Sequence, residues 1–171
     1  ASKKIKSDFF INVQGDEPTI NFKDIKKIID AKIKFPKDVI CGYDKIHKFE
    51  NVKNVNLPKV LINERDELIY ISRSVIPGSK NKNRKIKYFK QVCIYAFDKD
   101  QLKKFSSKKR KGKIEDIEDI EILRFFDLDI KVKMIKLNSN SVAVDEKKDV
   151  KKAERLIIRK INYNKKFMRN N

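Results

Sequence analysis

The chain has 171 residues, and its 43 Lys and Arg against 24 Asp and Glu give a formal net charge of +19. Hydrophobic residues make up 40% of it, which is enough for the core of one domain of ordinary size. No apolar run approaches the roughly 20 residues that cross a bilayer, and we expect neither a membrane-spanning helix nor a signal peptide.

The first predicted element is a buried strand over residues 9–13 (FFINV), a run of aromatic and β-branched residues. The segment 15–18 (GDEP) follows at once. Ligands of open α/β sheets bind at the carboxyl ends of strands, where the carboxylate of Asp16 can hold a hard cation such as Mg²⁺. The alternative is a plain turn, since Gly, Asp and Pro are common turn formers. Because a buried first strand needs neighbours, and Ala1 is not a methionine, we expect an N-terminal portion to precede this sequence.

The next element is a helix over residues 21–34, where isoleucines recur at helical spacing and Asn21 can serve as N-cap. Four strand-like runs follow, and a polar loop over 44–57 separates the first from the second. Two of them, joined by five polar residues, predict a hairpin. The four runs are residues 39–43, 59–62, 68–71 and 88–97.

Asp98 can cap a short helix that ends at Phe105, and a basic loop follows. Residues 114–126 then predict one amphipathic helix, with acids crowded into its first half, where the helix dipole favours negative charge. Short strands are predicted over 132–135 and 141–145. A closing helix over 149–161 completes one domain, residues 1–161, and a basic tail, 162–171, follows it.

Cys41 and Cys93 lie singly inside apolar strand-like runs, without a CxxC pairing. Free Cys is among the most buried residue types, and disulfides are rare in reducing compartments. We therefore expect two buried free thiols and a cytoplasmic protein.

Two carboxylates, those of Asp16 and Asp145, each follow an apolar run. If both strands run the same way in one sheet, the two side chains reach the same edge. Two carboxylates with waters and phosphate oxygens suit Mg²⁺ at about 2.1 Å. The alternative for Asp145 is an N-cap of the closing helix.

Several segments in this order resemble the sugar-acid cytidylyltransferases, and within them the 3-deoxy-manno-octulosonate cytidylyltransferases. The resemblance spans residues 9 to about 156. It is carried by residues 13–18 (VQGDEP), 70–77 (YISRSVIP), 93–97 (CIYAF), 114–124 (IEDIEDIEILR) and 144–145 (VD) with Asp149-Val150.

The resemblance implies a Rossmann-like α/β nucleotidyltransferase fold with a mixed sheet and a small dimerisation subdomain, and a homodimer. It implies transfer of CMP from CTP to a 2-keto sugar acid, with release of pyrophosphate. It also implies that Asp16 and Asp145 hold Mg²⁺ and that Gln14, Arg73 and Glu121 line the sugar-acid pocket. The residues agree, since Arg can bind a carboxylate in bidentate fashion and Gln and Glu can bond hydroxyls.

The chain departs from the family pattern at two places. Gln91 stands where the family often has a histidine that contacts the sugar, so a modified or different keto-sugar acid stays open as the substrate. The family's glycine-rich CTP loop has no counterpart here, and we expect this chain alone to be inactive. Two other interpretations stay open: a basic nucleic-acid-binding protein and a non-catalytic homologue. The lysines are interleaved with acids along the chain, which favours a solvated surface over a nucleic-acid groove.

Overall fold

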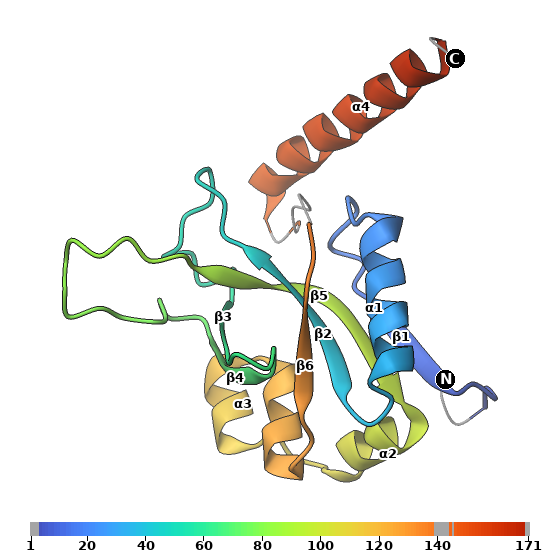
Figure 1. Ribbon diagram of the computed structural model, residues 1–171, viewed down its shortest axis with the longest axis vertical. Helices are drawn as coiled ribbons and strands as arrows, with labels where there is room; N and C mark the ends of the chain where they lie inside the picture. The colour runs from blue at the N-terminus through green and yellow to red at the C-terminus, as the bar shows by residue number, and fades with distance from the viewer. Residues whose placement is uncertain (1–3, 139–143, 145, 170–171) are drawn as a thin grey trace.

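The structure is a computed structural model that describes residues 4–138, 144 and 146–169. In this part of the chain, six strands form one mixed sheet with helices on both faces (Figure 1). The strands are β1 (Phe9–Val13), β2 (Val39–Lys45), β3 (Lys59–Ile62), β4 (Leu68–Ser72), β5 (Phe89–Asp98) and β6 (Val132–Lys136). The helices are α1 (Phe22–Lys34), α2 (Lys99–Ser107), α3 (Lys113–Glu118), the 3₁₀-helix η1 (Glu121–Leu128) and α4 (Lys147–Arg169). The predicted α/β class is confirmed.

The long strand β5 lies at the centre of the sheet, whose order is β4-β3-β5-β2-β6 with β1 paired to β5. β1 and β2 both run antiparallel to β5, and β6 runs parallel to β2. β1, β2 and β6 therefore point the same way, and their carboxyl ends lie at the same edge of the sheet.

One face of the sheet is covered by α1, which begins as predicted: the side chain of Asn21 accepts a hydrogen bond from the backbone N–H of Lys23 at 3.0 Å. The buried residues between α1 and the sheet are Ile28, Ala31, Ile40, Val92, Ile94, Ala96 and Leu137. The even-numbered positions of β5 thus face α1.

The other face carries α2 and η1 (Figure 1). Asp98 caps α2, as predicted, in a reciprocal pair of bonds with Gln101. The odd-numbered positions Tyr95 and Phe97 of β5 lie on this side and pack against Phe125 of η1. Since successive side chains of a strand alternate between faces, Gln91 and Cys93 belong to the same row.

Two expectations about helices are wrong. The single helix predicted over 114–126 is two pieces, α3 and η1, because Asp119 is left-handed (φ 51°) and Ile120 is extended. The closing helix does not end at Ile161, since α4 continues to Arg169 and runs away from the sheet (Figure 1). Within the described residues, no helix is long and apolar enough to span a membrane.

Burial also differs from the sequence prediction. β1 is half-buried to exposed rather than buried, with Val13 41% exposed, since among the described strands only β5 pairs with it. Three lysines, Lys32, Lys59 and Lys90, are buried rather than solvated. The predicted strand 141–145 falls mostly outside the described residues.

Candidate active site

The segment that follows β1 is tied to an irregularity in β5. The β2–β5 pairing shifts from Cys41 opposite Tyr95 to Gly42 opposite Val92, so β5 has extra residues at 93–94. Near that bulge, the backbone N–H of Gln14 donates to the carbonyl of Cys93 at 3.4 Å. The Glu17 carboxylate in turn accepts from the N–H of Cys93 at 3.1 Å. The Gly15–Pro18 turn is therefore fixed against the central strand.

This arrangement separates the roles of the two adjacent acids. Glu17 is 8% exposed and satisfies a backbone donor of β5, whereas Asp16 is exposed. Sequence reasoning missed Glu17, because nothing in the sequence distinguishes a buried acceptor from its exposed neighbour. Asp16 is therefore the exposed acid of the pair, and its role in holding Mg²⁺ stays a prediction.

The chain also returns to this turn from its C-terminal part. The backbone N–H of Val144 donates to the carbonyl of Asp16 at 2.8 Å. Asp145 lies outside the described residues, so the meeting of its carboxylate with that of Asp16 stays a prediction. Where residues are described, no group of three or more His, Cys, Asp or Glu could hold a metal ion. The predicted donor set still fits Mg²⁺, which commonly takes one or two carboxylates and completes its shell with waters and phosphate oxygens.

Arg73 lies just beyond β4 and explains why the predicted helix is interrupted. Its guanidinium donates to three main-chain carbonyls, those of Glu118 at 2.6 Å, Asp119 at 2.9 Å and Val55 at 3.0 Å. The carbonyls of Glu118 and Asp119 lie at the C-terminal end of α3, where the chain leaves the helix. Of the five N–H donors of an arginine, two remain for a substrate carboxylate. The predicted role of Arg73 in binding the sugar acid is untested.

The side chain of Glu118 forms a second set of bonds between the end of α3 and the end of β4. Its carboxylate accepts from the backbone N–H of Arg73 at 2.8 Å and from the hydroxyls of Ser72 at 2.6 Å and Tyr70 at 3.3 Å. Burial of the carboxylate opposes its ionisation, but these hydrogen bonds outweigh burial and lower the pKa of Glu118.

The buried side chain of Lys59 also bonds to the backbone of Arg73. It is 0% exposed, and its ammonium donates to the carbonyl of Arg73 and, at 3.1 Å, to that of Asn54. Burial lowers the pKa of Lys59, although the nearby carboxylate of Glu118 acts in the opposite direction. Arg73 is thus fixed by its backbone as well as by its guanidinium.

Gln91 bonds to a residue that sequence reasoning missed, Tyr95. The side-chain amide of Gln91 donates to the Tyr95 hydroxyl at 2.9 Å. Burial is the main cause that raises the pKa of Tyr95 well above its ordinary value, so this phenol stays protonated. The available signal was the spacing: Tyr95 follows Gln91 by four positions, which places both on one face of β5.

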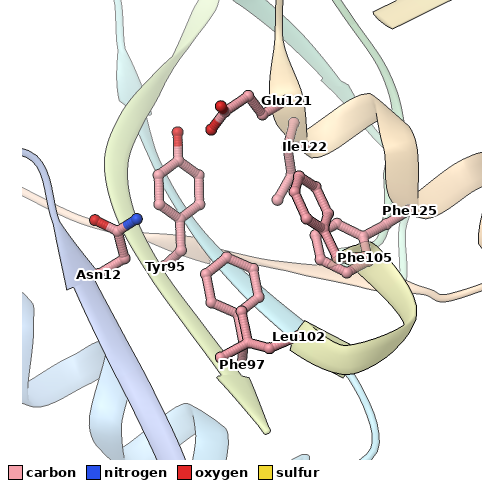
Figure 2. Close-up of a pocket in the computed structure, with 8 residues that line it drawn as sticks. All are labelled: Asn12, Tyr95, Phe97, Leu102, Phe105, Glu121, Ile122 and Phe125. Carbon is pink, nitrogen blue, oxygen red and sulfur yellow. The ribbon is translucent and has the colours of Figure 1, made fainter. Parts of the chain in front are cut away.

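A cavity of about 110 Å³ opens beside Tyr95 (Figure 2). Glu121, predicted to line the sugar-acid pocket, does line this cavity together with residues of β1, β5, α2 and η1. The complete lining is Asn12, Tyr95, Phe97, Leu102, Phe105, Glu121, Ile122 and Phe125. Three predicted residues lie on or against β5. The backbone of Gln14 bonds the carbonyl of Cys93, and the amide of Gln91 bonds the Tyr95 hydroxyl. Glu121 lines the cavity that Tyr95 also lines. Arg73 does not line the cavity; its guanidinium bonds the carbonyl of Asp119, two positions before Glu121.

The chain is similar in sequence to several known proteins. The family model described as cytidylyltransferase matches residues 1–135. A 3-deoxy-manno-octulosonate cytidylyltransferase of Fusobacterium nucleatum is 36% identical over 151 residues, which cover 86% of this chain and 60% of that protein. The enzyme of the same name from Flavobacterium johnsoniae is 29% identical over 157 residues, 88% of this chain and 62% of that protein.

Solved structures give the same result. A CMP:2-keto-3-deoxy-manno-octonic acid synthetase complexed with CTP matches with a TM-score of 0.83 and 29% identity, over 92% of this chain and 65% of that one. A putative glucose-1-phosphate thymidylyltransferase of Bacillus anthracis matches with a TM-score of 0.60 and 13% identity, over 91% of this chain and 56% of that one, a likeness of fold alone. The chain spans about three fifths of the length of the curated relatives described above.

Proposed function

The chain belongs to the cytidylyltransferase family, and on that premise we propose that it transfers CMP from CTP to a 2-keto sugar acid such as 3-deoxy-manno-octulosonate, releasing pyrophosphate. The observation that carries the proposal is the 36% identity with the Fusobacterium nucleatum enzyme over 151 residues. The position of Glu121 and Tyr95 at one cavity, with Gln91 bonded to the Tyr95 hydroxyl, supports it, because these side chains can bond sugar hydroxyls.

In the proposed reaction the anomeric hydroxyl of the sugar acid attacks the α-phosphorus of CTP. A P–O bond to the sugar forms as the bond to the leaving pyrophosphate breaks, and the hydroxyl proton is lost. The remaining N–H groups of Arg73 bind the sugar's carboxylate, which orients the attacking hydroxyl. Asp16, with Asp145, would hold Mg²⁺, which when bound neutralises charge on the phosphates. The bond from Val144 to the carbonyl of Asp16 supports this pairing, because it brings the neighbour of Asp145 to the turn.

Three further features follow from the same proposal. The protein would act as a homodimer in the cytoplasm, and its product would supply lipopolysaccharide biosynthesis, as the name of the sugar acid suggests. Sedimentation of the purified chain would report the dimer.

Pyrophosphate release tests the proposed reaction. Because the chain spans about 60% of its Fusobacterium nucleatum relative, we would join it to the segments of that enzyme that the match leaves uncovered. We expect release that requires CTP, Mg²⁺ and the sugar acid together, and we expect Asp16→Asn to abolish most of it. The unaltered relative is the positive control. A well-folded joined protein without release, beside an active control, would contradict the proposal.

A further inference from the structure

The cavity beside Tyr95 has two chemically different parts. Figure 2 shows the hydroxyl of Tyr95 and the carboxylate of Glu121 near one another, while three phenyl rings gather away from them. Asn12 adds an amide on the β1 side. The remaining lining, here called the apolar wall, is Phe97, Leu102, Phe105, Ile122 and Phe125.

The apolar wall is held in place by its own contacts. The ring centroids of Phe97 and Phe125 lie 5.6 Å apart, and those of Phe105 and Phe125 lie 5.3 Å apart. The guanidinium of Arg124 lies 4.0 Å from the centroid of Phe105 and is itself paired with the buried carboxylate of Glu115. Such a wall does not rearrange easily to offer a hydrogen-bond partner, since its rings are packed against one another.

The volume and chemistry of the cavity limit what it can hold. Purely apolar cavities of about 150 Å³ exclude water and bind a molecule the size of benzene. The cavity here, about 110 Å³, has room for a smaller group. A hydroxyl placed against the apolar wall would lose its hydrogen bonds to water without replacing them. A methyl group at the same place would be buried favourably.

We propose that the apolar wall receives a methyl-terminated substituent of the sugar acid, so that the preferred substrate carries a methyl or acetamido group where 3-deoxy-manno-octulosonate carries its terminal hydroxyl. This inference rests on the proposed function, in which Arg73 binds the carboxylate of the sugar and the anomeric hydroxyl faces the α-phosphate of CTP. The opposite end of the sugar is then the part left to enter the cavity. Glu121 and Tyr95 bond the hydroxyls that precede it.

A comparison of matched ligands tests the inference in the joined protein described above, in which this chain's part is unaltered or carries one substitution. Isothermal titration calorimetry would measure the binding of 3-deoxy-manno-octulosonate, its 8-deoxy analogue and its 8-acetamido-8-deoxy analogue, which share every other group. An apolar pocket discriminates by about 100-fold against an isostere that adds a hydroxyl, and by roughly 10–200-fold for one methylene. We therefore expect at least one of the two methyl-terminated ligands to bind about tenfold more tightly than the parent sugar.

Two variants locate the effect. Leu102→Phe fills the cavity from α2 and should remove the preference, so that the parent sugar and its two analogues bind with similar affinity. Ile69→Phe makes the same kind of enlargement at a residue of β4 that is 55% exposed and outside the cavity lining, and it should keep the preference. Equal or tighter binding of the parent sugar by the joined protein without a substitution would overturn this inference alone. Failure of all three ligands to bind would overturn both it and the proposed function.

Discussion

Glu118 offers the sharpest test of how the site is built, because one carboxylate joins the end of β4 to the break between α3 and η1. Replacing it by alanine takes the acceptor away from the backbone N–H of Arg73 and from the hydroxyl of Ser72. The carbonyl bonds of the Arg73 guanidinium remain, but the segment that carries Arg73 loses its anchor.

The size of the effect can be worked out from these bonds. A hydrogen bond to a charged group contributes about 1.5–3 kcal/mol to stability. Glu118 is only partly buried, so water can replace part of what the two shortest bonds supply. We therefore expect Glu118→Ala to lower the free energy of unfolding by about 2–3 kcal/mol. For a chain of this size each kcal/mol corresponds to about 2–4 °C, so Tm should fall by roughly 4–12 °C.

Thermal and urea unfolding followed by circular dichroism would measure the loss. The matched control is Asp116→Ala in the same helix, an exposed acid whose interaction with the helix dipole is worth no more than about 1 kcal/mol. Glu118→Gln keeps one carbonyl acceptor and should lie between the two. If Glu118→Ala cost no more than the control, the argument that this carboxylate organises the Arg73 corner would be refuted.

The pH dependence provides an independent check. Hydrogen bonding lowers the pKa of Glu118 in the folded protein despite burial. A carboxyl whose folded-state pKa is lowered stabilises the protein above its unfolded pKa, about 4.3, and loses that contribution as pH falls through the folded value. The stability difference between the unaltered chain and Glu118→Gln should therefore be largest near neutral pH and shrink below pH about 4.

Three more predictions concern other parts of the molecule. Asp16→Asn changes an exposed carboxylate, so the free energy of unfolding should change by less than about 0.5 kcal/mol. The joined protein should lose its Mg²⁺-dependent binding of CTP. A large stability loss would show instead that the carboxylate is structural. Gly42→Ala would place a Cβ 2.5 Å from Cδ1 of Leu137, and urea unfolding should show a loss of about 1–3 kcal/mol from overpacking; an unchanged midpoint would contradict the close approach. Burial raises the pKa of the Cys41 thiol, so a thiol reagent at pH about 8 should modify Cys93 first, as mass spectrometry of the peptides would show.

The local pattern of the sequence predicted most of the elements correctly. The apolar periodicity of residues 21–34 and the cap at Asn21 are local features, and α1 begins and ends as expected. The hairpin of β3 and β4 and the cap of α2 by Asp98 follow from short-range signals in the same way. Such elements depend on residues within a turn or two of one another, which is the range over which sequence patterns act.

The helix predicted over 114–126 failed for the opposite reason. Its apolar spacing and acidic first half are consistent with a continuous helix, yet Arg73 bonds the carbonyls of Glu118 and Asp119 from a different strand. Ile117, an apolar residue of that pattern, is 83% exposed. No local signal could reveal this, because the partner that favours the break lies 45 positions away in the sequence.

The sequence by itself therefore determined the α/β class, the resemblance to cytidylyltransferases and the candidate residues Gln14, Asp16 and Glu121, since motifs and periodicity are properties of the chain. The tertiary structure decided which of two neighbouring acids is buried, that Gln91 bonds to Tyr95, and that the cavity lined by Tyr95 and Glu121 is otherwise walled mainly by apolar side chains. Those outcomes depend on the β5 bulge and on side chains brought together from distant strands and helices. Their energies come from contacts that exist only once the sheet has formed.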